Sequence, residues 1–336
     1  MNRQLIKFCL AIGGLMSISL LANARVLAQP QHCDPAKVVT SAACAKCHVG
    51  EVNIWKQTPH AQTFESLHRN PQATEIARKL GQSSIKRNDI CVDCHYTSQA
   101  DDDLPRVVEG VSCESCHGAA HDWIAIHSDY GGPTANKHSE IDPHRLQRLT
   151  QSVASGMRNP KNLYSIARSC MQCHTVPNEK LVNVGGHIAG SQNFEMVSWS
   201  QGIVRHNFLR SGNAVNEVSS PERLRVMFVA GLIADLEFSS RATGAATQKS
   251  TYGLTVAARA AAVAVRLYQV QQLINDPHVQ QALESFAQAD LKINNAAQLN
   301  AIADRISQAG MQFADVADGS RLSAIDPLLP PHVQYK

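Results

Sequence analysis

Cysteine and histidine recur along this chain in one five-residue pattern. Eight of the ten cysteines form four pairs separated by two residues, and a histidine follows each pair directly. Two thiols three positions apart can bond the two vinyl groups of one porphyrin, and the next histidine then reaches the iron. The pattern predicts four covalent c-type haems, attached through Cys44, Cys47, Cys91, Cys94, Cys113, Cys116, Cys170 and Cys173, with proximal ligands His48, His95, His117 and His174.

Two other uses of paired cysteines compete with this interpretation. The pairs could form disulfides, or two pairs could hold one zinc ion. Neither use requires a histidine after every pair. Histidine is 15 of 336 residues, so four such coincidences are improbable, and haem attachment is the better prediction. Cys33 then has no partner among the motifs, and we expect it to be a free thiol or an intermolecular bridge.

The second axial ligand of each iron decides what the protein can do. An iron with two protein ligands passes electrons, whereas an iron with one open position can bind a small molecule. Met157, Met171 and Met196 could serve in principle, but methionine more often fills gaps in a core. Histidine is abundant, which favours low-potential haems with two histidine ligands each.

Two segments resemble a known family. They are Cys44–Ala61, with its Thr-Pro-His-Ala end, and Gly110–Gly118 around the third motif. Both are similar to the tetrahaem cytochromes that accept electrons from hydroxylamine oxidoreductase in ammonia-oxidising bacteria. The resemblance covers about residues 41–210.

The resemblance implies distal ligands at His60, His127 and His206. His121 lies close enough in sequence to replace His127. In that family the second haem has no distal residue and its iron is five-coordinate. This chain departs from the pattern by offering His187 between Gly186 and Ile188, where glycine allows a close approach to a haem face. With His187 as a ligand, all four irons would have two histidines.

The first residues are typical of an export signal. Arg3 and Lys7 precede a mostly apolar run over residues 8–22, and a small-residue cleavage site follows at residues 26–28. The run is too short for a membrane span, and no later stretch reaches the about 20 apolar residues required. Without residues 1–28 the chain goes from 31 basic and 28 acidic residues to 28 of each, so its charge gives no reason to expect nucleic-acid binding.

The elements that position the motifs should be mainly α-helical. Aromatic residues are only 5% of the chain, so the haems themselves would supply much of the core around short helices and loops. Helices are expected over residues 70–80, 142–154 and 163–167. Beyond residue 219, longer helices over 221–238, 251–274, 276–289 and 299–313 predict a bundle. We expect a signal peptide over 1–28, a tetrahaem domain over 29–218 and a helical domain over 219–336.

These features favour an exported, periplasmic electron-transfer protein over an enzyme. Its partners would be a redox donor and an acceptor, either of which could be membrane-bound. The alternative is a redox enzyme that acts on nitrogen oxides, hydroxylamine or a sulfur oxyanion at one five-coordinate haem. The C-terminal helices could cap a haem, join two copies of the chain or dock a partner. Asp101, Asp102 and Asp103 form either a docking patch or, more simply, a solvated loop.

The motifs make a prediction about covalent mass. After expression with the full haem-attachment machinery, the exported protein should exceed the mass of its mature polypeptide by four haems, because all four motifs are complete. Intact-protein mass spectrometry measures this directly. A fully matured protein with three or fewer haems would contradict the prediction.

Overall fold

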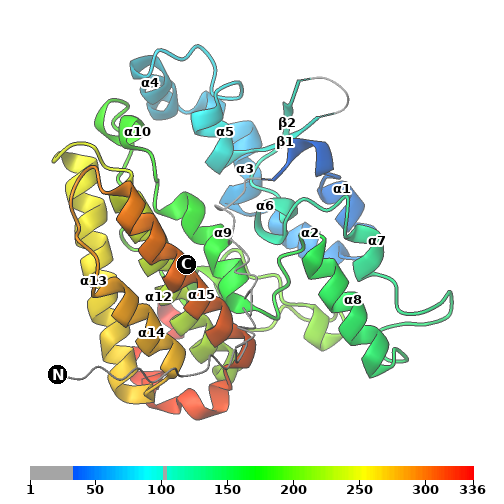
Figure 1. Cartoon of the computed structure of the whole chain (residues 1–336). Helices are drawn as coiled ribbons and strands as arrows, with labels where there is room; N and C mark the ends of the chain where they lie inside the picture. Colours follow the sequence, from blue (N-terminus) through cyan, green and yellow to red (C-terminus); the bar gives the residue numbers. More distant parts are fainter. Residues whose placement is uncertain (1–32, 101–103) are drawn as a thin grey trace, which may run out of the picture.

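The computed structural model describes residues 33–100 and 104–336. The predicted signal peptide, His32 and the three aspartates at 101–103 lie outside the described residues. Within the described ranges the chain is mainly α-helical, with a single two-stranded sheet, as the sequence predicts. Figure 1 shows the short early helices on one side, a bundle of long helices on the other, and α9 between them.

The motif-bearing half consists of short helices joined by loops. Strands β1 (Thr97–Gln99) and β2 (Arg106–Glu109) pair antiparallel between the second and third motifs. The helices are α1 (Ser41–Cys44), α2 (Val49–Trp55), α3 (Pro59–Ser66), α4 (Pro71–Lys79), α5 (Asp89–His95), α6 (Cys113–His117), α7 (Ile124–His127), α8 (Asp142–Ala154), α9 (Leu163–His174), α10 (Glu179–Asn183) and α11 (Met196–Ser200). Short 3₁₀ turns connect several of them, at Pro35–Lys37, Leu67–Arg69 and Leu209–Ser211.

Each motif lies at a helix end. The second and fourth motifs are the last turns of α5 and α9, and the third is α6 itself. The first motif joins α1 to α2, with His48 at the N-terminus of α2. Residues three positions apart share one face of a helical turn, so this local structure turns both thiols of a pair toward the same side.

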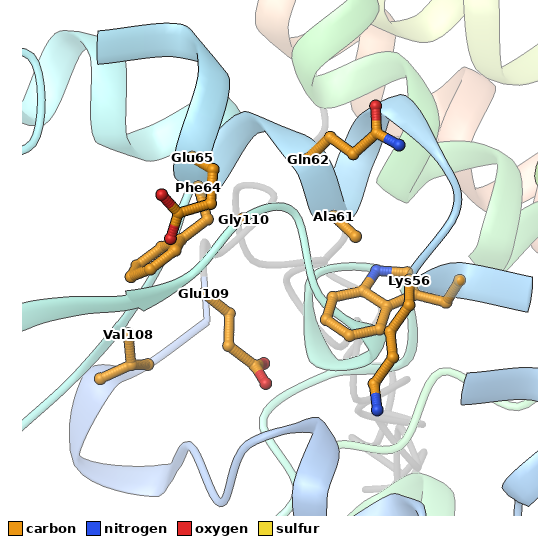
Figure 2. A pocket seen from close by; sticks show the side chains of 9 residues that line it. Lys56, Ala61, Gln62, Phe64, Glu65, Val108, Glu109 and Gly110 are labelled. Carbon is orange, nitrogen blue, oxygen red and sulfur yellow. The ribbon is translucent and has the colours of Figure 1, made fainter. Parts of the chain in front are cut away.

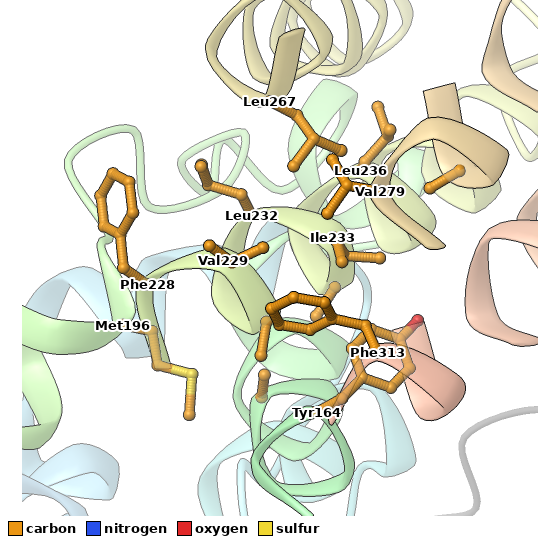
Figure 3. Packing of buried hydrophobic residues seen from close by; sticks show 14 of the residues in the cluster. Tyr164, Met196, Phe228, Val229, Leu232, Ile233, Leu236, Leu267, Val279 and Phe313 are labelled. Carbon is orange, nitrogen blue, oxygen red and sulfur yellow. The ribbon is translucent and has the colours of Figure 1, made fainter. Parts of the chain in front are cut away.

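The bundle contains α12 (Pro221–Gly244), α13 (Thr251–Ile274), α14 (Pro277–Phe286) and α15 (Ala296–Val316), followed by 3₁₀ turns at Gly319–Leu328 and His332–Gln334. The middle of α12 is buried on all sides, as its apolar run predicts. Figure 3 shows Val229, Ile233 and Leu236 of α12 packed with Leu267, Val279 and Phe313 from the other three helices. Among the described residues, no helix is long and apolar enough to cross a membrane.

The expected helices agree with the structure, apart from small differences in length. Residues 142–154 and 251–274 are helical over the whole predicted ranges. The helix expected over 163–167 continues to His174 and so includes the fourth motif. The helix expected to reach residue 289 ends at Phe286 and continues only as a turn.

Helix α9 joins the fourth motif to the bundle through buried polar contacts. The Arg168 guanidinium donates two hydrogen bonds of 3.0 Å to the Glu237 carboxylate of α12. The Tyr164 hydroxyl donates to the same carboxylate at 2.6 Å, and Arg241 bonds it from within α12. Replacing one partner of such a buried network leaves an unpaired charge, which is strongly destabilising. The fourth motif is therefore fixed to the bundle.

The contact between α9 and α15 makes a prediction about stability. Gly310 of α15 faces the Tyr164 ring, and a Cβ atom at residue 310 would overlap it. Gly310→Ala should lower stability by about 1–3 kcal/mol, because a packed core resists added volume. A reduced thermal unfolding midpoint of the holoprotein would show this. Gln308→Ala, at an exposed position of the same helix, is the matched control and should leave the midpoint unchanged. An unchanged midpoint for Gly310→Ala would mean that Tyr164 can move aside.

Candidate haem-binding sites

Each motif histidine faces one other histidine, and the partners come from the residues proposed as distal ligands. The ring centres of these pairs are 6.2–6.4 Å apart. The pairs are His48 with His127, His60 with His174, His95 with His187, and His117 with His206.

This separation fits one iron between the two rings of each pair. A metal–imidazole bond is about 2 Å long, and the bonded nitrogen lies about 1 Å from its ring centre. Two imidazoles on opposite sides of one iron therefore have ring centres about 6 Å apart. Direct contact between the rings would bring them closer, as at the 4.4 Å between His174 and Phe194.

Hydrogen bonds at the second ring nitrogen favour iron binding through the first. His127 Nδ1 lies 2.6 Å from the Ile124 carbonyl oxygen, His187 Nδ1 lies 2.9 Å from that of Ile188, and His206 Nδ1 lies 2.7 Å from that of Val204. A carbonyl oxygen only accepts, so Nδ1 must carry the proton. Nε2 is then free of a proton, which is the form that binds a metal.

Burial favours the neutral form of five of the facing imidazoles. Removal from solvent is the largest cause that lowers the pKa of His95, His117 and His174 to about 4 each. The same cause lowers the pKa of His60 and His127. A neutral imidazole is the form that coordinates iron, so these sites are prepared for a metal at neutral pH.

His60 is presented by the first turn of α3. Thr58 caps the helix by accepting a hydrogen bond from the Ala61 amide, and Pro59 occupies the first turn. The Val111 amide donates to the His60 carbonyl at 3.0 Å, where Gly110 passes too close for any side chain. This Gly-Val segment precedes the third motif, so α3 is held against it.

His127 is held by an ion pair from α8. Arg148 donates to the His127 carbonyl at 2.7 Å and binds the buried Glu140 carboxylate at 2.6 and 2.7 Å. Arg148 and His144 lower the pKa of Glu140 to about 2. The sequence does not predict these contacts, because Glu140 lies in a polar loop and Arg148 on a helix, and charged residues in such places are usually solvated.

Loops present the other two distal candidates. The Gly186 φ of +78° lets the chain turn sharply before His187, whose amide donates to the Leu181 carbonyl at 3.2 Å. Before His206, the amide of Ile203 donates to the carbonyl of Lys336 at 2.6 Å, so the end of the chain lies against this loop.

The remaining sequence candidates lie elsewhere. His121 is exposed and bonds Asp122 at 2.8 Å, so it does not face a motif histidine. His68 is half-buried in the turn between α3 and α4. Met171 is buried, with its sulfur 3.9 Å from Arg259 Nη2. Trp123 packs edge-on against His127, with ring centres 5.1 Å apart.

The nine cysteines of the described residues form no disulfide with one another. Cys33 donates from Sγ to the Glu114 carbonyl at 2.8 Å, and burial is the main cause that raises its pKa to about 12. A thiol with such a pKa is protonated and unreactive at neutral pH. The expectation of a free thiol therefore agrees with its surroundings.

Thiols of different motifs lie beside one another. Cys44 and Cys113 interact, which raises the pKa of Cys44 and lowers that of Cys113. Cys94 and Cys173 interact in the same way, and the hydrogen bond between them lowers the pKa of Cys94. Burial raises the pKa of both Cys116 and Cys170, and α6 packs against α9, so the third and fourth motifs are neighbours too.

Two carboxylates, the buried Glu114 and the half-buried Glu109, hold the first motif against the third. Glu114, inside the third motif, accepts hydrogen bonds from the amides of Val39 at 3.0 Å and Thr40 at 2.9 Å. Glu109 accepts from the amide and hydroxyl of Ser41 at 3.1 and 3.0 Å. These amides form the start of α1, so its N-terminus is fixed beside α6.

A pocket of about 280 Å³ lies between α3 and β2 (Figure 2). Phe64 and Val108 give it apolar walls, and Lys56, Glu65 and Glu109 are among its polar lining residues. Its lining contains no histidine and no cysteine. None of the proposed iron ligands therefore opens onto this pocket.

Comparisons with known proteins agree with this chemistry. Residues 43–118, which include the first three motifs, match the family model described as cytochrome c554 and c-prime. Cytochrome c-554 of Nitrosomonas europaea is 30% identical over 99 residues, and the match covers 26% of this chain and 41% of that protein. No solved structure matches the chain. The predicted resemblance is therefore confirmed, and residues 43–118 form a segment similar to the c-type cytochromes of the cytochrome c554 and c-prime family.

Proposed function

We propose that this protein is a periplasmic electron carrier with four covalent haems, each held between two histidines. The observation that carries the proposal is the set of four histidine pairs at one common separation. Each pair joins a motif histidine to one of His60, His127, His187 and His206. The bound haems would supply the one-electron chemistry, and the polypeptide would fix their ligands and spacing.

The contacts between motifs suggest an order for the relay. Because each haem would be bonded to its own thiols, neighbouring thiols of different motifs support neighbouring haems. The first motif adjoins the third through Cys44 and Cys113, and the fourth adjoins the second through Cys173 and Cys94. Cys116 and Cys170 join the two halves. The proposed order is first, third, fourth, second.

The proposed partners are redox proteins, one donor and one acceptor. With balanced side-chain charges after signal removal, two propionates on every haem would make the loaded protein acidic. An acidic carrier suits partners with basic docking surfaces and gives no reason to expect nucleic acid. Association of two copies through the C-terminal helices is compatible with this function and is not required by it.

The competing function is small-molecule redox catalysis at one five-coordinate iron. It requires one motif histidine without a partner, because a second imidazole would occupy the ligand position. His95 is the critical case, since the resemblance implies an open second haem. In this chain the His187 ring lies 6.3 Å from the His95 ring, which favours the carrier.

Carbon monoxide binding tests the role of His187. The ferrous wild-type protein should bind carbon monoxide slowly or not at all, because each iron has two imidazole ligands. His187→Ala should create one high-spin haem that binds it rapidly, as followed by stopped-flow absorbance. His138→Ala, in an exposed loop, is the control and should behave as wild type. Rapid binding by the wild type that is unchanged in His187→Ala would support the enzyme instead.

A second pair of substitutions separates His127 from His121. His127→Ala should convert one low-spin ferric haem to high spin in low-temperature electron paramagnetic resonance, because the His127 ring faces His48. His121→Ala should retain four low-spin haems, since His121 is exposed beside Asp122. A high-spin signal in His121→Ala, with a normal spectrum for His127→Ala, would reverse the assignment.

A further inference from the structure

His174, the histidine of the fourth motif, is bonded at both its backbone and its ring by one residue. The Ser191 hydroxyl lies 3.0 Å from His174 Nδ1, and the Ser191 amide donates to the His174 carbonyl at 2.8 Å. Phe194, three residues further on, stacks on the imidazole at 4.4 Å between ring centres. The segment after His187 therefore returns to cover the proximal side of the fourth motif.

The bundle fixes Ser191 in place through a buried arginine. Arg259 of α13 donates from Nη1 to the Ser191 carbonyl at 2.9 Å. The same guanidinium binds the Asp235 carboxylate of α12 at 2.7 and 2.9 Å. Ser239 completes the set by donating to Asp235 at 2.9 Å. Arg259 is buried in this ion pair.

The close approach of the loop to Arg259 requires glycine. Gly190 has a φ of +81°, a conformation that other residues rarely adopt. A Cβ atom at this position would lie 3.3 Å from Arg259 Nη1 and 3.2 Å from the Thr175 carbonyl. The loop, the arginine and the motif are thus packed tightly as one unit.

The other motif histidines have different surroundings. His117 Nδ1 lies 3.3 Å from the Arg158 carbonyl, and His48 Nδ1 lies 3.6 Å from a carboxylate oxygen of Glu51. Both partners come from the motif-bearing half of the chain. Among the motif histidines of the described residues, only His174 is hydrogen-bonded to a residue, Ser191, that is itself bonded to an ion pair of the bundle.

From this chain of contacts we propose that Ser191, held by Arg259 and Asp235, is a positioning residue that sets the redox potential of the fourth haem. The inference rests on the proposed haem binding by His174. With iron at Nε2, Nδ1 carries the proton and donates it to the Ser191 hydroxyl oxygen. A hydrogen bond at this position orients the ring and makes it a stronger electron donor, which stabilises ferric iron and lowers the potential. The C-terminal bundle then acts on the relay itself.

A potentiometric titration tests this proposal. Ser191→Ala should shift one of the four midpoint potentials upward and leave the other three unchanged, because only His174 loses its acceptor. Ser191→Thr keeps the hydroxyl and should restore the wild-type potential. Arg259→Lys, which breaks the two-bond contact with Asp235, should move the same haem. Arg225→Lys is the matched control, since Arg225 binds Asp326 within the bundle and contacts no motif.

The outcomes distinguish this inference from the proposed function. Four haems in the intact mass, with all four potentials unchanged in Ser191→Ala, would overturn the role of Ser191 and leave the carrier intact. Loss of the fourth haem alone in Ser191→Ala, restored in Ser191→Thr, would support the positioning role. A wild-type protein without haem at the fourth motif would remove the basis of both proposals.

Discussion

The constraint behind this architecture is the common separation of four facing pairs of histidine rings, which the proposed function explains by one iron between the two rings of each pair. Each pair needs rings about 6 Å apart on opposite sides of a flat group, so no short segment can supply both. His60 precedes the second motif yet faces the fourth, and His127 follows the third motif yet faces the first. These crossed pairings interleave the chain, so the segments that carry the motifs depend on one another for their positions.

The same constraint explains the uneven distribution of the apolar core. The main core cluster lies in the bundle, with α9 at its edge, whereas the cluster around Ala77, Ile85 and Tyr96 is small. A half with few buried side chains cannot bury enough apolar surface alone, and four haems would supply the missing area. The carboxylates of Glu109 and Glu114 then fix the backbone where few side chains are buried. Folding of this half should therefore be coupled to haem attachment.

Residue patterns were sufficient for some parts of the structure and insufficient for others. The helix at residues 251–274 follows from its alanine-rich composition, and the choice of His60 as a candidate ligand from the family resemblance. The ion pairs of α12 could not be predicted, because Asp235 and Glu237 lie in a run of mostly apolar residues. Their partners Arg259 and Arg168 are distant in sequence, and no local period relates them. Ser191 and Arg148 act through hydrogen bonds to the backbone or ring of a histidine, which residue type alone does not predict.

The bundle meets the proposed relay at an interior position. In the proposed order the fourth haem lies between the third and the second, so every electron that crosses the protein must pass it. A change in the potential of a terminal haem alters exchange with one partner, whereas a change at an interior haem alters transfer in both directions. The two buried ion pairs of α12, one to α9 and one to α13, both converge on this motif. Buried ion pairs contribute little net stability but define one arrangement well. A bundle that only stabilised the fold would not need ion pairs beside the fourth motif.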